Sequence, residues 1–534
     1  MYSKIGASPS VGAKNRTKDD VNPISGLCGV CLESCIGLCE VGQSAVSGTE
    51  MIYPQPFGDL TSASVKEYPI NWGHLNILGT PVGTHGIEAD SDKAIFPNVK
   101  VTSALGKKDG KEGIRLKLPT TVPGLGSTDV ARKNWEALAT GTALYGVVLT
   151  IGENVVGMDE EAEFVGGRVK NSPSFNYRIS AYKKWQHDGF GGIIAQENVE
   201  DMRLGVLEYA IEKGIDGVEL KWGQGAKNIG GEVKIRNLEK AQMLKRRGYI
   251  VLPDPEDPEV IKAFEKKSFK EFERHSRLGM VTEEGFAKRV SVLRSAGARY
   301  IFLKTGAYRF EDLARAVAYC SMYGVDVLTI DAAGGGTGMS PWRMMNEWGT
   351  PPIETFQKAY EFVDRLAKKG KHIPDLVFAG GFSLEDHIFK GLAFGSPYVK
   401  AIGMGRAPLT AVMSSSALWR RIDTESDHNL VSMYGREKDE IFFGAREVKS
   451  LVGDRFKTLP AGALGVFTYY MRIEQGLRQL MAGARKFNFE ESGSRPDRND
   501  LVSLTKEVAG ITGISYIMDL DKEKAEELIK KAEK

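Results

Sequence analysis

Short apolar runs alternate with longer amphipathic segments through the central part of the chain. The apolar runs lie at 143–151, 191–196, 217–223, 299–306, 325–335, 375–381 and 398–408. Between the last four runs, residues 310–324, 352–370 and 384–395 have apolar side chains at spacings of three and four and end in glycine. These spacings and terminal glycines are typical of helices. The alternation therefore predicts β–α units and a parallel sheet.

The ends of the last four predicted strands favour a closed barrel over an open, doubly wound sheet. They carry Lys304, Asp331 followed by "AAGGG", the pair Gly380–Gly381, and "GMGR" at 403–406. Functional-looking residues at successive strand ends fit a (β/α)8 barrel, whose site gathers there. A dinucleotide-binding fold requires G-x-G-x-x-G, and the segments at 124–129 and 403–408 lack the third glycine. We therefore expect an α/β fold built on a (β/α)8 TIM barrel.

Changes in composition and in the spacing of apolar residues along the sequence predict three regions. Residues 1–105 are rich in loops and contain clustered cysteines, which predicts an N-terminal cysteine-rich region. The barrel is expected at 106–430, with a charged insertion at about 225–290 that should form solvated helix and loop. Residues 431–534 form the expected C-terminal helical extension.

Composition narrows the class of protein without identifying its substrate. The 534 residues carry 71 basic and 69 acidic side chains, and the net charge of +2 provides no field that would attract nucleic acid. No apolar run is long enough for membrane insertion, and the N-terminus lacks the apolar core of a signal peptide. We expect a cytoplasmic protein.

Two glycine pairs that follow neighbouring strands indicate a phosphate site. Gly380 and Gly381 close one predicted strand, with Ser383 as the expected N-cap of the next helix. Gly403 and Gly405 close the following one, and Arg406 comes next, as a phosphate partner. Loops after the last barrel strands often bind phosphate through backbone N–H groups. Tight turns without a ligand are the alternative interpretation.

Lys304 and the glycines at 334–336 suggest what the phosphate belongs to. A lysine at the end of an apolar strand suits a cation beside the N1 and C2 carbonyl of a flavin, although a lysine reaching toward solvent is as common. Together with the two glycine pairs it indicates flavin mononucleotide (FMN). The three glycines would then let the backbone pass close to the flat ring.

The motifs "VELKWGQGAKNIGGEV", "DAAGGGTGMSP", "FAGG" and "IGMGRAP" resemble the FMN-binding synthase domain of glutamate synthase, over residues 118 to about 490. The resemblance implies catalytic roles for Lys304, Gln224 and Lys227, with Gln224, Lys227 and Lys221 near the flavin and a 2-oxoglutarate or 2-iminoglutarate site. The residues expected to bind the cofactor are Gly124, Gly126, Ser127, Lys221, Lys304, Gly335, Gly336, Gly380, Gly381, Gly403, Gly405 and Arg406.

The chain also departs from the family pattern. Ala333 and Gly334 stand where family members usually carry His-Asp, and Glu232 is displaced in "NIGGE". The three cysteines that hold a 3Fe–4S cluster after the last barrel strand are absent from "LTAVMSSSALWRR". No cysteine nucleophile follows Met1, so we expect no amidotransferase domain before the barrel, and we expect ammonia to come from a separate amidotransferase or from solution.

Four of the five cysteines lie within twelve residues. Cys28, Cys31, Cys35 and Cys39 have the spacing C-x2-C-x3-C-x3-C. Thiolates this close suit a [4Fe–4S] cluster or, as an alternative, zinc. A buried apolar stripe on a helix is a further interpretation, which the glycines between the cysteines weaken. The fifth, Cys320, is expected to be a core thiol.

The resulting hypothesis is an FMN-dependent oxidoreductase of the glutamate synthase type, acting on CH–NH2 donors. It would aminate a 2-oxo acid reductively, or run in reverse on an amino acid, within a homo- or hetero-oligomer. Electrons would come from ferredoxin or an electron-donor subunit through the cluster. One alternative is a nucleotide dehydrogenase-like barrel, whose chemistry requires a loop cysteine. The other is a non-catalytic or differently specific electron-transfer or scaffold subunit of a larger complex.

Overall fold

The computed structural model describes residues 45, 68–108, 110–225, 228, 232–335 and 340–534. The four clustered cysteines, Lys227 and Gly336 lie outside these residues.

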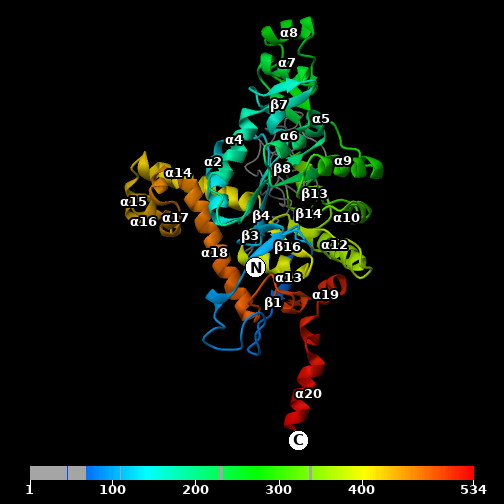
Figure 1. The fold of residues 1–534 in the computed structure, drawn as a ribbon, viewed down its shortest axis with the longest axis vertical. Helices are drawn as coiled ribbons and strands as arrows, with labels where there is room; N and C mark the ends of the chain where they lie inside the picture. Colours follow the sequence, from blue (N-terminus) through cyan, green and yellow to red (C-terminus); the bar gives the residue numbers. More distant parts are fainter. Residues whose placement is uncertain (1–44, 46–67, 109, 226–227, 229–231, 336–339) are drawn as a thin grey trace, which may run out of the picture.

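Eight parallel strands close into a barrel, which confirms the predicted fold (Figure 1). In chain order the strands are β4 (Thr120–Leu125), β5 (Val148–Ile151), β8 (Gly192–Glu197), β9 (Gly217–Lys221), β13 (Ile301–Thr305), β14 (Val327–Asp331), β15 (Asp375–Ala379) and β16 (Val399–Gly403). The barrel closes where β16 pairs with β4. Seven of these strands coincide with the apolar runs of the sequence. β4 does not, because Pro123 and Gly124 interrupt its apolar pattern.

Helices surround the barrel and alternate with its strands. The three helices predicted from their periodicity are α10 (Phe310–Tyr323), α12 (Pro352–Ala367) and α13 (Glu385–Phe394). Further helices of the barrel region are α2 (Asp129–Tyr145), α3 (Val155–Met158), α4 (Pro173–Lys183), α5 (Val199–Leu204), α6 (Val206–Glu212), α9 (Glu283–Ser295), α11 (Trp342–Glu347) and α14 (Arg406–Asp423). Buried helix faces and strand residues form one extended apolar core, and a second, smaller apolar cluster contains other strand residues, among them Val148, Phe302 and Val377.

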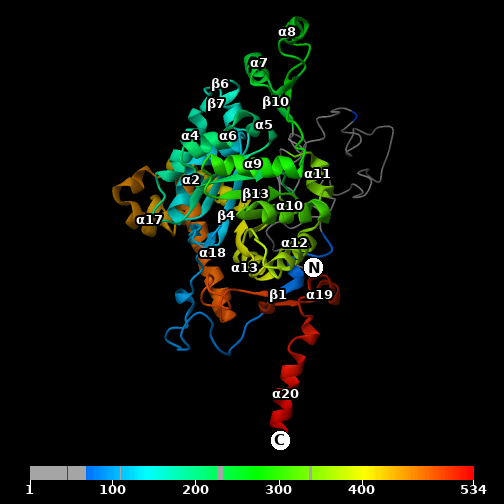
Figure 2. The same ribbon diagram turned by 45° about the vertical axis from the view of Figure 1, so that its right-hand side comes forward.

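Part of the charged segment between β9 and β13, residues 232–275, projects from the barrel as a lobe (Figure 2). It contains the expected helices α7 (Leu238–Arg246) and α8 (Pro258–Glu265). It also contains an antiparallel sheet that the sequence analysis did not predict, in the order β10 (Glu232–Ile235), β12 (Phe272–His275), β11 (Ile250–Leu252). In β12 the buried Phe272 and Arg274 alternate with half-buried neighbours, a two-residue period hidden by the charge of the segment.

The C-terminal region is helical, as expected, and returns to the start of the described chain. Its main helices are α15 (His428–Tyr434), α16 (Lys438–Ile441), α17 (Ala445–Val452), α18 (Ala461–Gly483), α19 (Lys506–Thr512) and α20 (Lys522–Ala532). α18 packs along α14 and α2. β1 (Leu75–Ile77) pairs antiparallel with β17 (Leu501–Ser503), so both ends of the described chain share one small sheet. Among the described residues, no helix is long and apolar enough to cross a membrane.

Candidate functional site at the barrel mouth

The strand register brings the predicted site residues to one end of the barrel. Lys304 on β13 lies beside Lys221 on β9 and beside Thr329 on β14. One step further round, Asp331 pairs with Ala379, the last residue before Gly380. The carboxyl ends of the strands therefore gather the lysines and the glycine loops at one mouth, as a (β/α)8 barrel requires.

Lys304 is buried in this mouth, and its charge is balanced by a carboxylate. The residue is 5% exposed, and Nζ lies 3.3 Å from Asp331 Oδ2. Burial lowers the pKa of Lys304, but the charges of Asp331, Glu219 and Glu153 outweigh it, so the net shift is upward. Lys304 is therefore a fixed cation inside the barrel and does not reach toward solvent.

A buried carboxyl group below Lys304 was missed by the sequence analysis. Glu219 accepts hydrogen bonds from Gln196 Nε2 and, at 3.4 Å, from Thr329 Oγ1. Burial raises the pKa of Glu219, although Lys304 and Lys221 oppose the shift. The signal was available, because in "GVELK" Glu219 and Lys221 share the inward face of an apolar strand. Gln196 adds a buried Oε1 that has no hydrogen-bond partner among the described residues.

Lys221 and Gln224 are brought together, as predicted, and a second carboxylate joins them. Lys221 Nζ donates to Gln224 Oε1 at 2.9 Å and to Glu153 Oε1 at 2.5 Å. Glu153 lies in the loop after β5 and carries no motif that would reveal its role. The ammonium group of Lys221 at the end of β9 thus connects the loop after β5 with the loop after β9.

The glycine-rich loop after β14 is crowded by the chain itself. A Cβ on Gly335 would lie 1.9 Å from Asp331 Oδ1, and one on Gly225 would lie 2.1 Å from the Ala332 carbonyl oxygen. Gly334 adopts a positive φ of 114°. Among described residues, the missing side chains of Gly335 and Gly225 therefore make room for the Asp331 carboxylate and for neighbouring backbone. The flavin ring expected beside residues 334–336 remains a prediction of the sequence.

The two predicted phosphate loops lie on neighbouring strands. Gly380 and Gly381 have φ values of 115° and 98°, which few other residues adopt. Gly403 ends β16, and Gly405 is the N-cap of α14. No atom lies within 4 Å of a Cβ built on Gly405, so the space at this helix N-terminus is open. The free N–H groups at the N-terminus of such a helix can bind an anion.

Ser383 does not cap α13, contrary to the prediction. The N-cap residue is Leu384, without a side-chain hydrogen bond, and the Ser383 carbonyl accepts from the Tyr469 hydroxyl. Arg406 is the first residue of α14, and burial lowers its pKa.

The other two predicted glycines lie in the loop after β4, where a Cβ on Gly124 would lie 2.8 Å from Gln196 Oε1 and one on Gly126 2.5 Å from the Glu153 carbonyl oxygen. Their missing side chains therefore allow this loop to approach β8 and the loop after β5. Ser127 lies two residues before the start of α2.

Two further outcomes concern cysteine chemistry. Cys320 is fully buried in α10, and burial raises its thiol pKa, which confirms a core thiol. The predicted cluster ligands lie outside the described residues. Within the described part of the chain, no group of His, Cys, Asp and Glu could hold a metal ion.

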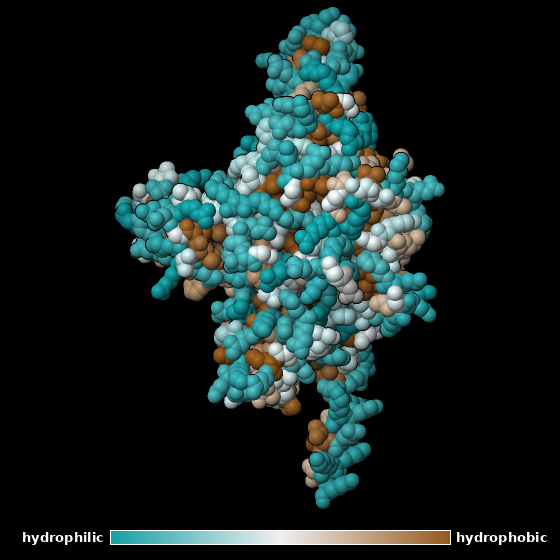
Figure 3. Space-filling model, viewed as in Figure 1, coloured by the Kyte–Doolittle hydropathy of each residue, from teal (hydrophilic) through white to brown (hydrophobic). Residues whose placement is uncertain are grey.

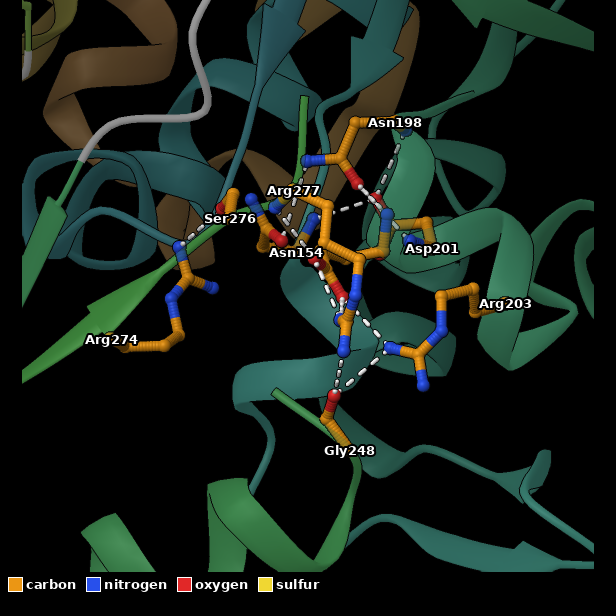
Figure 4. Close-up of polar contacts among 9 residues, drawn as sticks. Asn154, Asn198, Asp201, Arg203, Gly248, Arg274, Ser276 and Arg277 are labelled. Atoms are coloured by element: carbon orange, nitrogen blue, oxygen red, sulfur yellow. Dashed lines mark hydrogen bonds and ion pairs between the residues drawn. The ribbon is translucent and has the colours of Figure 1, made fainter. Parts of the chain in front are cut away.

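A pocket of about 390 Å³ opens beside the mouth, between the end of β9, the start of α5 and residues 277–286. Its lining includes the predicted Lys221 and Gln224 together with Glu153. Arg277 and Arg289 also line it, and neither was singled out from the sequence. Figure 4 shows Arg277 and Arg203 converging on the Gly248 carbonyl, close to Asn198 and Asp201.

Comparison with known proteins identifies one conserved region. Residues 274–418 match the model of the conserved region in glutamate synthase. A glutamate synthase large subunit-like protein from Rhizobium meliloti (strain 1021) is 24% identical over 397 residues, 72% of each chain.

Two solved structures resemble the fold at low identity. A soluble mutant of (S)-mandelate dehydrogenase from Pseudomonas putida is 14% identical and covers 80% of this chain and 88% of its own, with a TM-score of 0.42. Inosine 5′-monophosphate dehydrogenase from Legionella pneumophila is 13% identical, and the match covers 82% of this chain and 99% of that chain, with a TM-score of 0.41. The match of residues 274–418 to the glutamate synthase region, together with the Rhizobium meliloti relative, confirms the resemblance that the motifs predicted.

Proposed function

We propose that this protein is an FMN-dependent oxidoreductase of the glutamate synthase type, which reductively aminates a 2-oxo acid or oxidises the corresponding amino acid. The observation that supports it most strongly is the buried cation Lys304, in a barrel mouth that also carries two glycine-containing loops after neighbouring strands. The match of residues 274–418 to glutamate synthase supports the same reaction class.

The residues of the mouth fit FMN. The open space at Gly405 and the N-terminus of α14 would receive its phosphate, together with Gly380 and Gly381. Lys304 would lie at the pole of the ring that becomes negative on reduction. No second nucleotide-binding motif accompanies these loops, which favours FMN over FAD.

The reaction balances with ammonia and two electrons. Ammonia condenses with the keto group of the 2-oxo acid and releases water, which leaves an imine. The imine gains two electrons and two protons and becomes the amino acid. Reduced FMN, when bound, would supply the two electrons and one of the two hydrogens as a hydride, and the second proton would come from an acid or from water. Lys221 and Gln224 would orient the carboxylate end of the substrate, with Lys227 as a further cation near it.

Electrons and ammonia would reach the barrel from outside it. Cys28, Cys31, Cys35 and Cys39 would hold a [4Fe–4S] cluster, or zinc in the alternative, that receives single electrons from ferredoxin or a donor subunit. Ammonia would come from a separate amidotransferase or from solution. Cytoplasmic placement and assembly into an oligomer remain predictions of the sequence.

The proposal is tested with protein whose flavin has been reduced by dithionite and then freed of excess reductant. Adding a 2-oxo acid with ammonium should reoxidise the flavin in one phase and yield one amino acid for each flavin. Reoxidation should fail when either component is left out. A reduced flavin that no 2-oxo acid and ammonium reoxidise would overturn the reaction and favour an electron-transfer subunit.

A further inference from the structure

Lys400 occupies a β-bulge at the end of the barrel opposite the mouth. Leu376 on β15 pairs with Val399 on β16. The next pair is Val377 with Ala401, so β16 carries one extra residue, Lys400. Its two neighbours on β16 are buried, whereas Lys400 is half-buried. A bulge at the rim of a barrel changes the direction of a side chain. Lys400 therefore lies at the rim formed by the amino ends of the strands.

Hydrogen bonds to backbone oxygens hold a second cation beside Lys400. Lys400 Nζ donates to the Pro397 carbonyl oxygen at 2.8 Å, and Arg495 Nη1 donates to the same oxygen at 3.1 Å. Arg495 Nη2 donates to the Glu490 carbonyl oxygen, also at 3.1 Å. Because two donors end on one oxygen atom, the ammonium and guanidinium groups lie next to each other despite their like charges.

Two further lysines follow β2 (Ser103–Leu105), which packs against β16. Lys108 Nζ donates to the Ile373 carbonyl oxygen at 2.7 Å. Lys107 is exposed, and its side chain has no partner among the described residues. Both lysines are close enough to Lys400 to lower its pKa. We define the basic rim by four residues: Lys107, Lys108, Lys400 and Arg495.

The basic rim has more positive than negative charge. None of its four side chains forms an ion pair with a carboxylate of the described residues. The described carboxylates whose charges act on it are those of the buried Asp375 and of Glu490. Asp326, close to Asp375, is already paired with Lys111 at 2.6 Å and with Arg294 at 2.7 Å. Among the described residues, four cations therefore share two carboxylates.

Two groups of the basic rim lack the partner that a buried or half-buried cation usually has. Burial and the charges of Arg495 and of the two other lysines lower the pKa of Lys400 to about 8. Asp375 opposes this shift without cancelling it. Arg495 Nε is buried and has no hydrogen-bond partner among the described residues, and an unsatisfied buried donor destabilises a protein. An anion bound at the basic rim would stabilise both groups.

This concentration of cations is local. The whole chain has 71 basic and 69 acidic side chains and a net charge of only +2. Hydrophobic residues on the face in Figure 3 are scattered between larger hydrophilic areas. The pocket of about 390 Å³ lies at the other end of the barrel, beside the mouth. A ligand of the basic rim would therefore be recognised by its charge and not by an apolar body.

We propose that the basic rim binds a small anion with at least two negative charges, of the phosphate or pyrophosphate class. Two negative charges balance the excess of the four cations over the two described carboxylates. Lysine and arginine N–H groups form strong, charge-assisted hydrogen bonds with phosphate oxygens. Two of the cations share one backbone oxygen, and such a compact site favours a small anion over an acidic protein segment. The proposed flavin site lies at the opposite, carboxyl ends of the strands, so this inference does not rest on the proposed function.

Calorimetry with the full chain, with and without added FMN, measures the dissociation constants of pyrophosphate and ADP. We expect one pyrophosphate site per chain, whose affinity falls with added salt and does not change with FMN. Tighter binding of ADP identifies a nucleotide as the source of the phosphates, and equal or weaker binding identifies free pyrophosphate; either result supports the inference. Lys400→Met should weaken pyrophosphate binding about tenfold or more. Lys107→Met, at an exposed position that does not affect folding, should weaken it to a smaller extent.

Proton uptake gives a second measurement that a merely structural lysine would not change. About half of the Lys400 side chains are neutral at pH 8, because their pKa is about 8. An anion stabilises the charged form, so binding raises this pKa and takes up protons at pH 8 but not at pH 6. Sulfate is the probe, since its two charges do not titrate in this range. The uptake is obtained from binding enthalpies in buffers of different ionisation enthalpy, and Lys400→Met should abolish it.

Lys133→Met is the matched control. Lys133 is exposed near the start of α2, at the mouth end of the barrel, so this variant should bind pyrophosphate like the unmodified protein. Equal effects of Lys400→Met and Lys133→Met would overturn the inference, as would the absence of binding at millimolar pyrophosphate. Competition between FMN and pyrophosphate would overturn it by placing the anion in the mouth. Tighter binding of polyglutamate than of pyrophosphate would replace the small anion with an acidic protein segment.

Discussion

The pairing of Lys304 with Asp331 decides how much charge the barrel mouth offers to a ligand. The two groups lie 3.3 Å apart and are both buried, so the charge of Lys304 is balanced by that of Asp331. Removing one partner leaves the other charge buried, which typically costs about 3–5 kcal/mol. The effect of a Lys304 variant therefore includes the effect of leaving the Asp331 charge without a partner.

Lys304→Met should lower the reduction potential of the bound flavin, because the Asp331 charge then faces the reduced ring without its counter-ion. A loss of about 1.4 kcal/mol corresponds to about 30 mV for a two-electron couple. Spectroelectrochemical titration measures the shift, and Lys304→Met with Asp331→Asn recovers the fold if the single variant is unstable. Lys368→Met, at an exposed site on α12, is the control. An unchanged potential in folded, flavin-loaded Lys304→Met would remove Lys304 from the flavin site.

Asp201 should make the protein less stable as pH rises. Burial raises the pKa of Asp201 to about 8, partly opposed by the Asn154 backbone N–H, whereas its ordinary value is 3.8. Its contribution to stability is therefore complete below about pH 4 and is lost as pH rises toward 8. Asp201→Asn removes this titration, so its melting temperature relative to the unmodified protein should increase from pH 4 to pH 8.

Asp254→Asn is the matched control for that pH series. Its carboxylate is exposed, and Lys245 lowers its pKa, so this variant should show no relative gain at high pH. Parallel melting curves for Asp201→Asn and the unmodified protein across the range would contradict the assignment.

At the scale of elements, the hydrophobic pattern of the sequence predicted most barrel strands but missed β4 and the sheet of the insertion. Buried parallel strands are continuous apolar runs, so seven barrel strands were visible, but β4 was hidden by its proline and glycine. The insertion sheet was hidden because its strands are short and charged. Lys304 could be predicted from the sequence, because it is a charged residue at the end of an apolar strand. Glu153, Arg277 and Arg289 could not, because only tertiary packing brings them to the site.

The N-terminus of α14 should bind the flavin phosphate through backbone N–H groups. Gly405→Ala places a methyl group in space that is open in the structure. The free energy of unfolding of the flavin-free protein should stay within about 0.5 kcal/mol, while FMN affinity, measured by fluorescence titration, should fall about tenfold or more, a loss of about 1.4 kcal/mol. Gly510→Ala in α19, also at an open position, should leave FMN affinity unchanged, although alanine favours the helix. Unchanged FMN affinity in Gly405→Ala would move the phosphate away from this helix.

At the scale of the whole molecule, the N-terminal region is tied to the far end of the chain. The β1–β17 pairing anchors residues 75–77 to residues 501–503, below the barrel in Figure 1, while α20 extends beyond them. The cysteine segment precedes this anchor in the sequence. The proposed electron transfer through the cysteine segment must therefore be tested with the full-length chain, in which this anchor is present.

Single replacements of Cys28, Cys31, Cys35 or Cys39 by serine should remove iron and leave FMN bound. Thiolates at these spacings would be cluster ligands, so each loss should abolish reduction by ferredoxin and spare reduction by dithionite. Iron, sulfide and flavin analysis of anaerobically purified protein measures this. Cys320→Ala, at the buried thiol of α10, should retain iron. Stoichiometric zinc without sulfide in the unmodified protein would replace the relay with a structural metal site.

The identity of the bound flavin tests the central proposal most directly. Protein purified without oxygen, or reconstituted with equal amounts of FMN and FAD, is freed of excess flavin and heated, and the released flavin is identified by chromatography. The account predicts FMN at roughly one per chain, because the barrel mouth offers one pair of phosphate loops. Release of FAD, or a protein that retains no flavin after reconstitution, would contradict it.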